Sequence, residues 1–220
     1  MKRGHEIVDH VLQAIQGCHA ATGTTLVGID GPGGAGKSVL SASIARKDSC
    51  ISVVPIDDFY VPRDNRVGGR DAVLTPWKNM EVSRLLREVL QPLTAGDEAS
   101  YRRYDWGTDA LAERRGVPAD GIVLVEGVYA LLPPLKDYYQ LRVWIDCPRE
   151  LRLARGLARD GQDALAQWRD QWMPAEDRYA SIQRPKDGAD LVLGWERMES
   201  GHPALILKRR RQVHRDQAET

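Results

Sequence analysis

The amino-acid sequence predicts an α/β fold in which helices flank a parallel five-stranded sheet. Short apolar runs alternate with segments of helical spacing, and each connection between parallel strands requires such a crossover helix. Sheets of this kind are covered on both faces, which explains why the runs are apolar rather than alternating. Strands are predicted at residues 24–30, 51–56, 121–127, 141–147 and 189–193.

Helices are predicted before and between these strands. The opening segment HEIVDHVLQAI places its apolar residues on one helical face, and KSVLSASIARK, after the first strand, also has helical spacing. Residues 61–78 are rich in Gly, Pro and charge, so they are expected to form a long loop before a helix at roughly 79–93. A further helix is expected in the charged segment 148–159.

Composition restricts the classes of function. The chain has 220 residues and equal numbers of basic and acidic residues, 31 of each, so its formal net charge is zero. This length suits one domain spanning 1–220, and a neutral chain has no overall field that attracts nucleic acid or a membrane. The three cysteines lack metal or redox spacing, and no apolar run approaches the ~20 residues that cross a bilayer. We expect a cytoplasmic protein that acts on a small molecule, with homo-oligomerisation left open.

The C-terminal segment, about 201–220, is basic and contains KRRR at 208–211. Terminal charge runs are usually solvated, so an exposed tail is the favoured interpretation. Nucleic-acid binding through KRRR is a weaker alternative.

A glycine-rich motif follows the first predicted strand. Residues 31–38, GPGGAGKS, match G-x-x-x-x-G-K-[ST], with a strand before the motif and a helix after it. Glycines let backbone N–H groups turn towards phosphate oxygens, while the lysine pairs with the β- and γ-phosphates and the hydroxyl binds Mg²⁺. The motif predicts a P-loop NTPase that binds ATP and Mg²⁺. The expected nucleotide contacts are Gly31, Gly33, Gly34, Ala35, Gly36, Lys37, Ser38 and Val39.

Carboxylates follow two other predicted strands. Asp57 and Asp58 come after the second strand, and Glu126 ends the third. The carboxyl ends of parallel strands meet at one edge of the sheet, so these side chains should approach the glycine loop. One of the aspartates can accept a proton from an attacking hydroxyl, and Glu126 suits Mg²⁺. Turn or helix-cap carboxylates are the alternative interpretation.

Three arginines, Arg152, Arg155 and Arg159, are spaced three and four residues apart. A helix would present them on one side, as a lid over the phosphates requires, and arginines there stabilise developing charge. The lid is expected at about 148–180. From spacing alone, an exposed basic face paired with Glu150 and Asp160 is the favoured interpretation.

The ordered motifs resemble the uridine kinase family, within the group that includes phosphoribulokinases. The similar segments are GPGGAGKS at 31–38, DDFY at 57–60, YRRYDW at 101–106, LVEGVYAL at 124–131, RLARGLARD at 152–160 and PKDGADLVL at 185–193. The resemblance implies a mobile lid and transfer from ATP to the 5′-hydroxyl of uridine or a related nucleoside. It also implies roles for individual residues: catalysis by Asp57, Lys37, Arg155 and Arg159, metal binding by Ser38, Asp57 and Glu126, phosphate binding by Arg152, Arg155 and Arg159, and substrate contacts by Tyr60 and Tyr104.

Two positions depart from the family pattern, and both concern the substrate. Where the family has a histidine that reads the pyrimidine, the nearby residue is Asp109. Where it has an aspartate for the ribose hydroxyls, the stretch LTPWKNME has no acid before Glu81, and Asp64 or Asp71 would have to substitute. Tyr60, Tyr104 and Trp106 suit stacking on a flat base, although core packing would also explain them.

These observations favour an ATP-dependent small-molecule kinase with Asp57 as general base. Kinases of the same outline that act on nicotinamide riboside, pantothenate or a sugar are alternatives. A second class of function is that of a nucleotide-binding regulatory protein that lacks an acceptor site. ATP and GTP are not distinguished as donors by the sequence.

Overall fold

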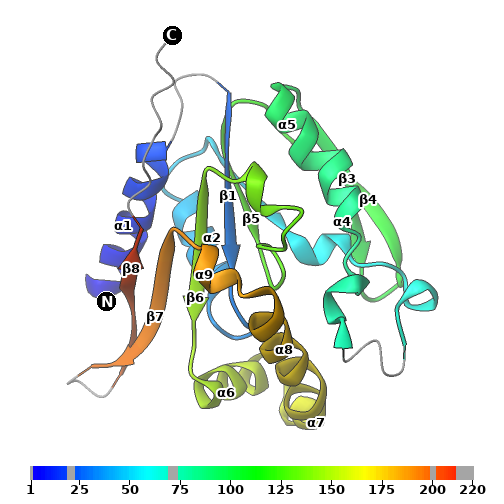
Figure 1. Cartoon of the computed structure of the whole chain (residues 1–220), viewed down its shortest axis with the longest axis vertical. Coiled ribbons are helices and arrows are strands. Elements are labelled where there is room, and N and C mark those ends of the chain that lie inside the picture. Colours follow the sequence, from blue (N-terminus) through cyan, green and yellow to red (C-terminus); the bar gives the residue numbers. More distant parts are fainter. Residues whose placement is uncertain (1, 19–22, 69–73, 199–201, 212–220) are drawn as a thin grey trace.

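A six-stranded sheet in the order β2-β5-β1-β6-β7-β8 forms the centre of the computed structural model, which describes residues 2–18, 23–68, 74–198 and 202–211 (Figure 1). Five strands run parallel, and the sixth, β8, pairs antiparallel with β7. The α/β class is confirmed, but the expected count of five strands is wrong. The sheet strands are β1 (Thr24–Asp30), β2 (Ile51–Pro55), β5 (Gly121–Glu126), β6 (Leu141–Asp146), β7 (Leu191–Arg197) and β8 (Pro203–Arg210).

The additional strand lies within the segment expected to be a solvated tail. Leu205 and Leu207 of β8 pack against the core, which explains why these residues join the sheet. The basic residues nearby have backbone and carboxylate partners: Lys208 pairs with Glu196, and Arg209 donates to the carbonyl of Lys186. Residues 212–220 of the expected tail lie outside the described residues.

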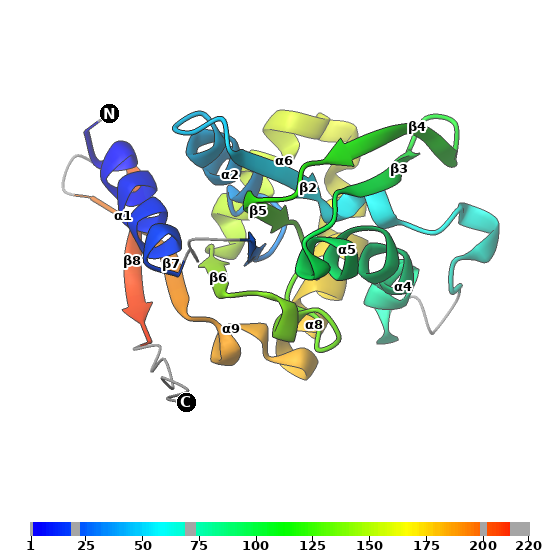
Figure 2. The ribbon, with the colours of Figure 1, turned by 90° about the horizontal axis from the view of Figure 1, so that it is seen from above.

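Helices cover both faces of the sheet. Helices α1 and α2 contribute to one core cluster, while the helical stretch of α4 to α5, together with α8, contributes to the other. Figure 2 shows α2 and α8 on opposite sides of the sheet. The α-helices are α1 (Lys2–Cys18), α2 (Lys37–Ala45), α4 (Val82–Leu85), α5 (Gln91–Ala95), α6 (Arg149–Asp160), α7 (Leu165–Gln167), α8 (Met173–Gln183) and α9 (Pro185–Gly188).

Short helical turns connect several of these elements. The helix expected at roughly 79–93 spans 82–95, because a π-helical turn, η4 (Leu86–Leu90), joins α4 to α5. A second π-helical turn, η7 (Trp168–Trp172), joins α7 to α8. The remaining turns are 3₁₀-helical: η1 (Ile56–Phe59), η2 (Arg63–Asn65), η3 (Pro76–Asn79), η5 (Lys136–Tyr138) and η6 (Gln162–Ala164).

The central strands alternate their side chains between the two cores. Val123 and Val125 of β5 face one cluster, whereas Ile122 and Leu124 face the other. All four are buried. Burial on both faces explains why each strand reads as a continuous apolar run. None of the described helices is long and apolar enough to span a membrane.

An antiparallel hairpin of β3 (Ala99–Asp105) and β4 (Ala110–Val117) lies outside the main sheet. Its buried face includes Tyr101 and Tyr104, while Arg102 and Arg114 occupy its polar face. The predicted strand list lacks this hairpin because only one of its faces is apolar.

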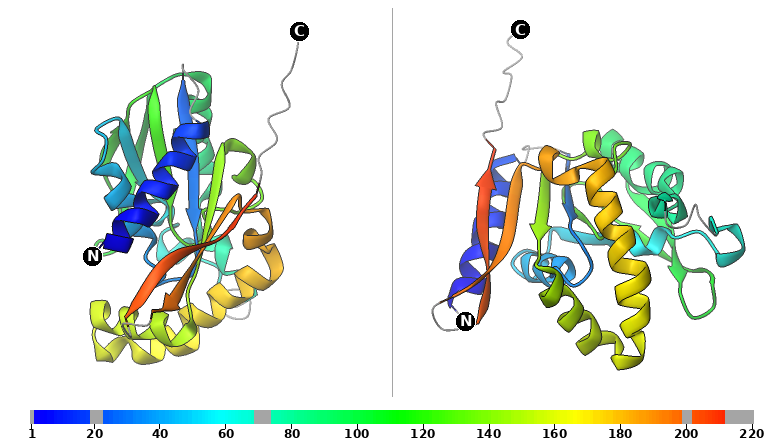
Figure 3. Two further views of the ribbon diagram at one scale, coloured as in Figure 1. Left: turned by 90° about the vertical axis from the view of Figure 1, so that its left-hand side faces the viewer. Right: turned by 60° about the horizontal axis from the view of Figure 1, so that its bottom comes forward.

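Three elements gather at the end of the sheet where β1 leads into the glycine loop. Helices α6, α7 and α8 lie together below the sheet in Figure 1, and Figure 3 shows α6 and α8 side by side at that end. The strand order places the carboxyl ends of β2, β5 and β1 next to one another. The predicted carboxylates and the predicted lid therefore meet at the same edge.

Candidate active site

The glycine loop, residues 31–38, connects β1 to α2. Gly34 has φ +75°, and a Cβ atom there would lie 2.7 Å from the carbonyl oxygen of Arg152. Gly31 is equally restricted, because its Cβ would lie 2.4 Å from the carbonyl oxygen of Ile145. Larger residues would force the loop away from its neighbours and from a phosphate. Gly33, Gly34, Gly36, Lys37, Ser38 and Val39 line an open cleft, whereas Gly31 and Ala35 lie beneath its surface.

Lys37 lies over this loop. Its Nζ donates to the carbonyl oxygens of Gly31, at 2.8 Å, and Pro32, at 3.0 Å. The side chain is buried but lines the cleft, so its charge is held at the loop where phosphates would bind. Val39, one residue beyond Ser38, is 72% exposed and offers the cleft an apolar surface.

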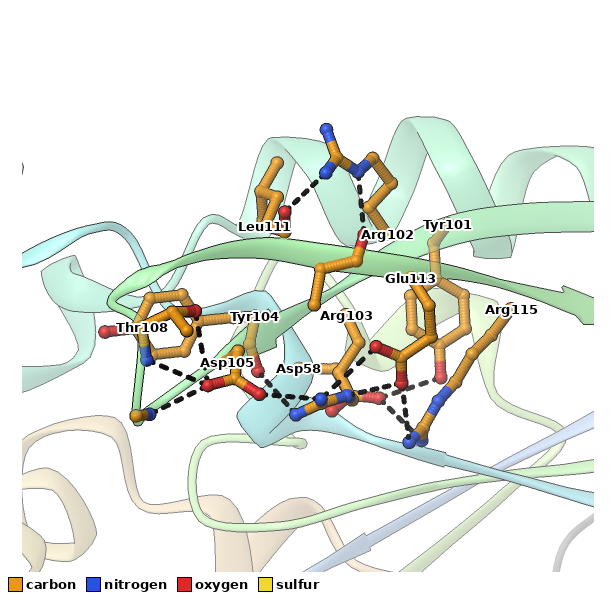
Figure 4. A network of polar contacts seen from close by, with 12 residues as sticks. Asp58, Tyr101, Arg102, Arg103, Tyr104, Asp105, Thr108, Leu111, Glu113 and Arg115 are labelled. Atoms are coloured by element: carbon orange, nitrogen blue, oxygen red, sulfur yellow. Dashed lines mark hydrogen bonds and ion pairs between the residues drawn. The ribbon is translucent and has the colours of Figure 1, made fainter.

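Asp57 and Asp58 have different surroundings. Asp57 is exposed within the cleft, whereas Asp58 is buried and turned towards the β3–β4 hairpin. The carboxylate of Asp58 accepts hydrogen bonds from the Tyr101 hydroxyl, at 3.0 Å, and from Arg115, at 3.2 Å (Figure 4). Dense protein around Asp57 raises the pKa of its carboxyl, with Asp58 adding to the increase and Lys37 opposing it. Of the two acids, Asp57 is the one placed to meet a ligand.

Glu126, at the end of β5, is the second carboxylate of the cleft. It forms a hydrogen bond with the Ser38 hydroxyl, while its Oε2 atom is buried without a hydrogen-bond partner. Burial raises the pKa of Glu126, Lys37 and Ser38 oppose this increase, and Asp57 reinforces it. An unsatisfied carboxylate oxygen beside a hydroxyl and a second acid is a suitable oxygen donor set for Mg²⁺.

A Mg²⁺ ion at this site would have few protein ligands. Within the described ranges, no group of three or more His, Cys, Asp or Glu side chains is placed to hold a metal. Mg²⁺ bound to a nucleotide usually keeps several waters and takes one or two carboxylates, so Ser38, Asp57 and Glu126 fit this requirement. We find no conflict between the residues present and a Mg·ATP site.

The three arginines of α6 are in three different environments. Arg152 is buried and pairs with Glu176, at 2.5 Å, and Asp177, at 2.8 Å. Arg155 lines the cleft, donates to the Gly34 carbonyl at 3.3 Å, and stacks on Trp195 with its Cζ atom 3.7 Å from the ring centroid.

Arg159 also lines the cleft and forms a two-bond pair with Asp160. It lies close enough to Asp57 to lower the pKa of that carboxyl. The structure therefore brings Arg155 and Arg159 to the cleft, and it places Arg152 behind the glycine loop.

Glu176 of α8 is a functional candidate that sequence reasoning missed. Its Oε2 atom accepts the backbone N–H of Gly33 at 3.0 Å, and its side chain lines the cleft. Burial raises the pKa of Glu176, while Arg152 and Lys37 oppose this increase. Helix α8 thus places a carboxylate on the phosphate loop. The one available sequence indication was an acid within the predicted lid region, about 148–180.

Asp30, the last residue of β1, was also missed. It is fully buried, and its carboxylate accepts four hydrogen bonds: from the backbone N–H groups of Gly31, Tyr129 and Leu131 and from the Tyr179 hydroxyl. Burial raises its pKa to about 6, against the lowering effect of these bonds and of Lys37. Asp30 therefore fixes the start of the glycine loop to the segment after β5 and to helix α8.

The aromatic residues expected at the substrate divide into two sets. Tyr60 and Trp106 line the cleft, with ring centroids 4.7 Å apart. Tyr104 is 1% exposed and lies behind Trp106, with its hydroxyl bonded to Asp109. Asp109 also accepts the backbone N–H of Arg63 at 3.0 Å and does not line the cleft. A direct substrate contact by Tyr104 or Asp109 remains a prediction.

The two candidate ribose acids can be located only in part. Asp64 is exposed in η2 and does not line the cleft. Asp71 lies outside the described residues. Glu81 is bonded to Arg84 at 2.8 Å and is not a cleft residue either.

The fold and the cleft define an α/β nucleotide-binding protein of the P-loop class. The sequence model described as the Phosphoribulokinase / Uridine kinase family matches residues 26–194. A uridine kinase from Macrococcus caseolyticus (strain JCSC5402) is 26% identical over 189 residues, covering 77% of this chain and 91% of that protein.

Solved structures share the fold. A possible uridine kinase from Bacillus stearothermophilus superposes with a TM-score of 0.67 at 21% identity, covering 86% of this chain and 97% of that one. A putative fructose transport system kinase from Silicibacter sp. TM1040 has a TM-score of 0.65 at 20% identity, covering 79% and 94%. The chain therefore belongs to the phosphoribulokinase / uridine kinase family. It is a phosphotransferase with an alcohol group as acceptor.

Proposed function

We propose that this chain, acting as one kinase domain with a lid, transfers the γ-phosphate of Mg·ATP to a hydroxyl of a small molecule, with Asp57 as general base. The observation that carries the proposal is the placement of Asp57. It lines the same cleft as the phosphate loop and the Ser38–Glu126 pair, whereas Asp58 is turned away. A carboxylate facing the phosphate site is what a hydroxyl acceptor requires.

The proposed reaction gives separate roles to the glycine loop and to the carboxylates and arginines beside it. The N–H groups of the glycine loop and Lys37 bind the triphosphate, and Ser38, Asp57 and Glu126 hold Mg²⁺. Bound Mg²⁺ would neutralise phosphate charge. Asp57 orients the acceptor hydroxyl and accepts its proton. Arg155 and Arg159 place positive charge beside the transferring group, and the lid excludes water.

Uridine or a related nucleoside is the acceptor that the relatives named uridine kinase support. Tyr60 and Trp106 add an aromatic surface at the cleft. The neighbour named as a fructose transport system kinase supports a sugar instead. Nicotinamide riboside and pantothenate complete the set of acceptors to be compared.

The proposal is tested by acceptor-dependent ADP release from Mg·ATP. We expect one acceptor of the set to stimulate release, and Lys37→Ala to abolish the stimulation because it removes the cation at the phosphate loop. Lys186→Ala is the matched control, since Lys186 pairs with Asp146 and does not line the cleft. ATP binding without stimulation by any acceptor would contradict the proposal and favour a regulatory protein.

A further inference from the structure

Two arginines that line the cleft have no role in the phosphate chemistry proposed above. Arg63 begins η2, and Arg66 follows it directly. We call the part of the cleft around them the acceptor end and define it by six cleft-lining residues: Asp57, Tyr60, Arg63, Arg66, Asn79 and Trp106.

Arg66 is held in one orientation. Its Nε atom donates to the Val61 carbonyl at 2.9 Å, and its Nη2 atom donates to the Tyr104 hydroxyl at 2.7 Å. Its Cζ atom lies 5.4 Å from the Tyr60 ring centroid and 5.0 Å from the Trp106 centroid. Stacking of this kind orders a guanidinium while leaving its edge available for ligands.

Arg63 is positioned beside it from the same loop. Its side chain donates to the Trp106 carbonyl at 3.3 Å, and its backbone N–H is fixed by Asp109. The side chain is exposed at the cleft. Two guanidinium groups are thus presented at the acceptor end.

The two guanidinium groups at this end have no direct carboxylate partner in the part of the chain that the structure describes. Among the described residues, neither Arg63 nor Arg66 forms an ion pair with a carboxylate. Asp109 lies close to both arginines, and its pKa is lowered chiefly by the Tyr104 hydroxyl and also by the two arginines. One carboxylate that is already hydrogen-bonded therefore lies close to two guanidiniums. Two of the three predicted lid arginines differ, because Arg152 and Arg159 have carboxylate partners of their own, whereas Arg155 stacks on Trp195.

The acceptor end is also within electrostatic range of the proposed base. Burial raises the pKa of the Tyr60 hydroxyl, the charge of Asp57 adds to this increase, and Arg66 opposes it. The Tyr60 hydroxyl is therefore close enough to Asp57 and Arg66 for their charges to affect its pKa. Asp57 is the single carboxylate of the acceptor end, and the proposed reaction already employs it.

We infer that the acceptor is an anionic alcohol, whose carboxylate or phosphate group binds to Arg66 and Arg63 while its hydroxyl faces Asp57. This inference rests on the proposed function and names its substrate class. A planar guanidinium can donate two parallel N–H hydrogen bonds to a carboxylate or to a phosphate. The same arginines therefore suit either anionic group. A neutral nucleoside would leave both guanidiniums without an anionic partner.

The first experiment compares each anionic acceptor with an uncharged analogue. ADP release from Mg·ATP is measured with glycerate and glycerol, with pantothenate and panthenol, and with ribulose 5-phosphate and ribulose, beside uridine as a neutral nucleoside. We expect a charged member to have a kcat/KM at least about 100-fold above that of its neutral partner. Preferred turnover of glycerate or pantothenate would identify the anionic group as a carboxylate, whereas preferred turnover of ribulose 5-phosphate would identify it as a phosphate.

The second experiment changes Arg66. Arg66→Gln is expected to raise the KM of the charged acceptor about 10- to 150-fold, with a smaller change in kcat and an unchanged KM for ATP. Arg66→Lys should restore part of the loss because the charge returns without the paired donors. Arg114→Gln is the control, since Arg114 lies on the same hairpin that carries Trp106 but does not line the cleft.

The outcomes separate the two claims. Equal turnover of charged and neutral partners, or an Arg66→Gln variant with an unchanged acceptor KM, would overturn the inference and leave the proposed kinase function standing. No ADP release with any compound would contradict the proposed function, and the inference with it. A loss of thermal stability in Arg66→Gln without an acceptor-specific KM change would assign Arg66 to bracing the loop and overturn the inference.

Discussion

Asp57 and Asp58 are adjacent and chemically identical, yet they face different partners. Both lie in the 3₁₀ turn η1, where successive side chains point about 120° apart. One carboxylate therefore faces the cleft, while the other is held by Tyr101 and Arg115. The sequence could predict that a carboxylate follows β2, but the choice between the two depends on the rotation of this turn.

At the same scale, Glu176 places a negative charge on the phosphate loop, and this charge should weaken nucleotide binding. Glu176→Gln keeps an oxygen that can accept the Gly33 N–H but removes the charge. We expect the Kd for Mg·ATP at pH 8 to fall about three- to tenfold, as measured by titration calorimetry.

The pH dependence of that difference follows from the raised pKa of Glu176. The carboxyl is charged above this pKa, so the advantage of the variant is complete at high pH and decreases as the wild-type group becomes protonated. Asp177→Asn is the control, because Asp177 also pairs with Arg152 but makes no contact with Gly33. A Kd that is unchanged or higher in Glu176→Gln would show that Glu176 serves mainly to neutralise Arg152.

At the scale of elements, the proposed lid depends on close contact between α6 and η7. A Cβ atom at Gly156 would lie 2.3 Å from Trp168, whose ring is buried. The ring is fixed further by a hydrogen bond from its Nε1 atom to Asp160 at 2.8 Å. This contact fixes the position of α6, the helix that carries Arg155 and Arg159, relative to η7.

Gly156→Ala should separate α6 from η7. We expect it to lower the free energy of unfolding by about 1–3 kcal/mol in denaturant titrations, and to raise the KM for ATP because two cleft arginines move. Gly188→Ala in α9 is the matched control, since its Cβ would meet no heavy atom within 4 Å. Wild-type stability and KM in Gly156→Ala would refute this account of the lid.

At the scale of the whole molecule, the order of the strands assembles the site. The adjacent carboxyl ends of β1, β5 and β2 bring together the glycine loop, Glu126 and Asp57 from positions far apart in the chain. This gathering was predictable, because apolar runs that end in carboxylates mark one edge of a parallel sheet.

Other features depend on tertiary contacts and were not predictable in the same way. Strands β3, β4 and β8 are only partly apolar, so their sequences lack the continuous runs of the central strands. Arg152 has the same spacing as the other lid arginines, but pairing with Glu176 and Asp177 draws it behind the glycine loop. The order of residues along a helix cannot reveal such partners from another helix.

The central claim is that Asp57 accepts the proton of the acceptor hydroxyl. The most direct test is γ-phosphate transfer by Asp57→Asn beside Asp58→Asn, with Mg·ATP binding measured for both variants. We predict that Asp57→Asn still binds ATP and loses at least about 10²-fold in kcat, while Asp58→Asn, whose amide oxygen can still accept from Tyr101 and Arg115, keeps turnover within about tenfold of wild type. Undiminished transfer in Asp57→Asn would contradict the account.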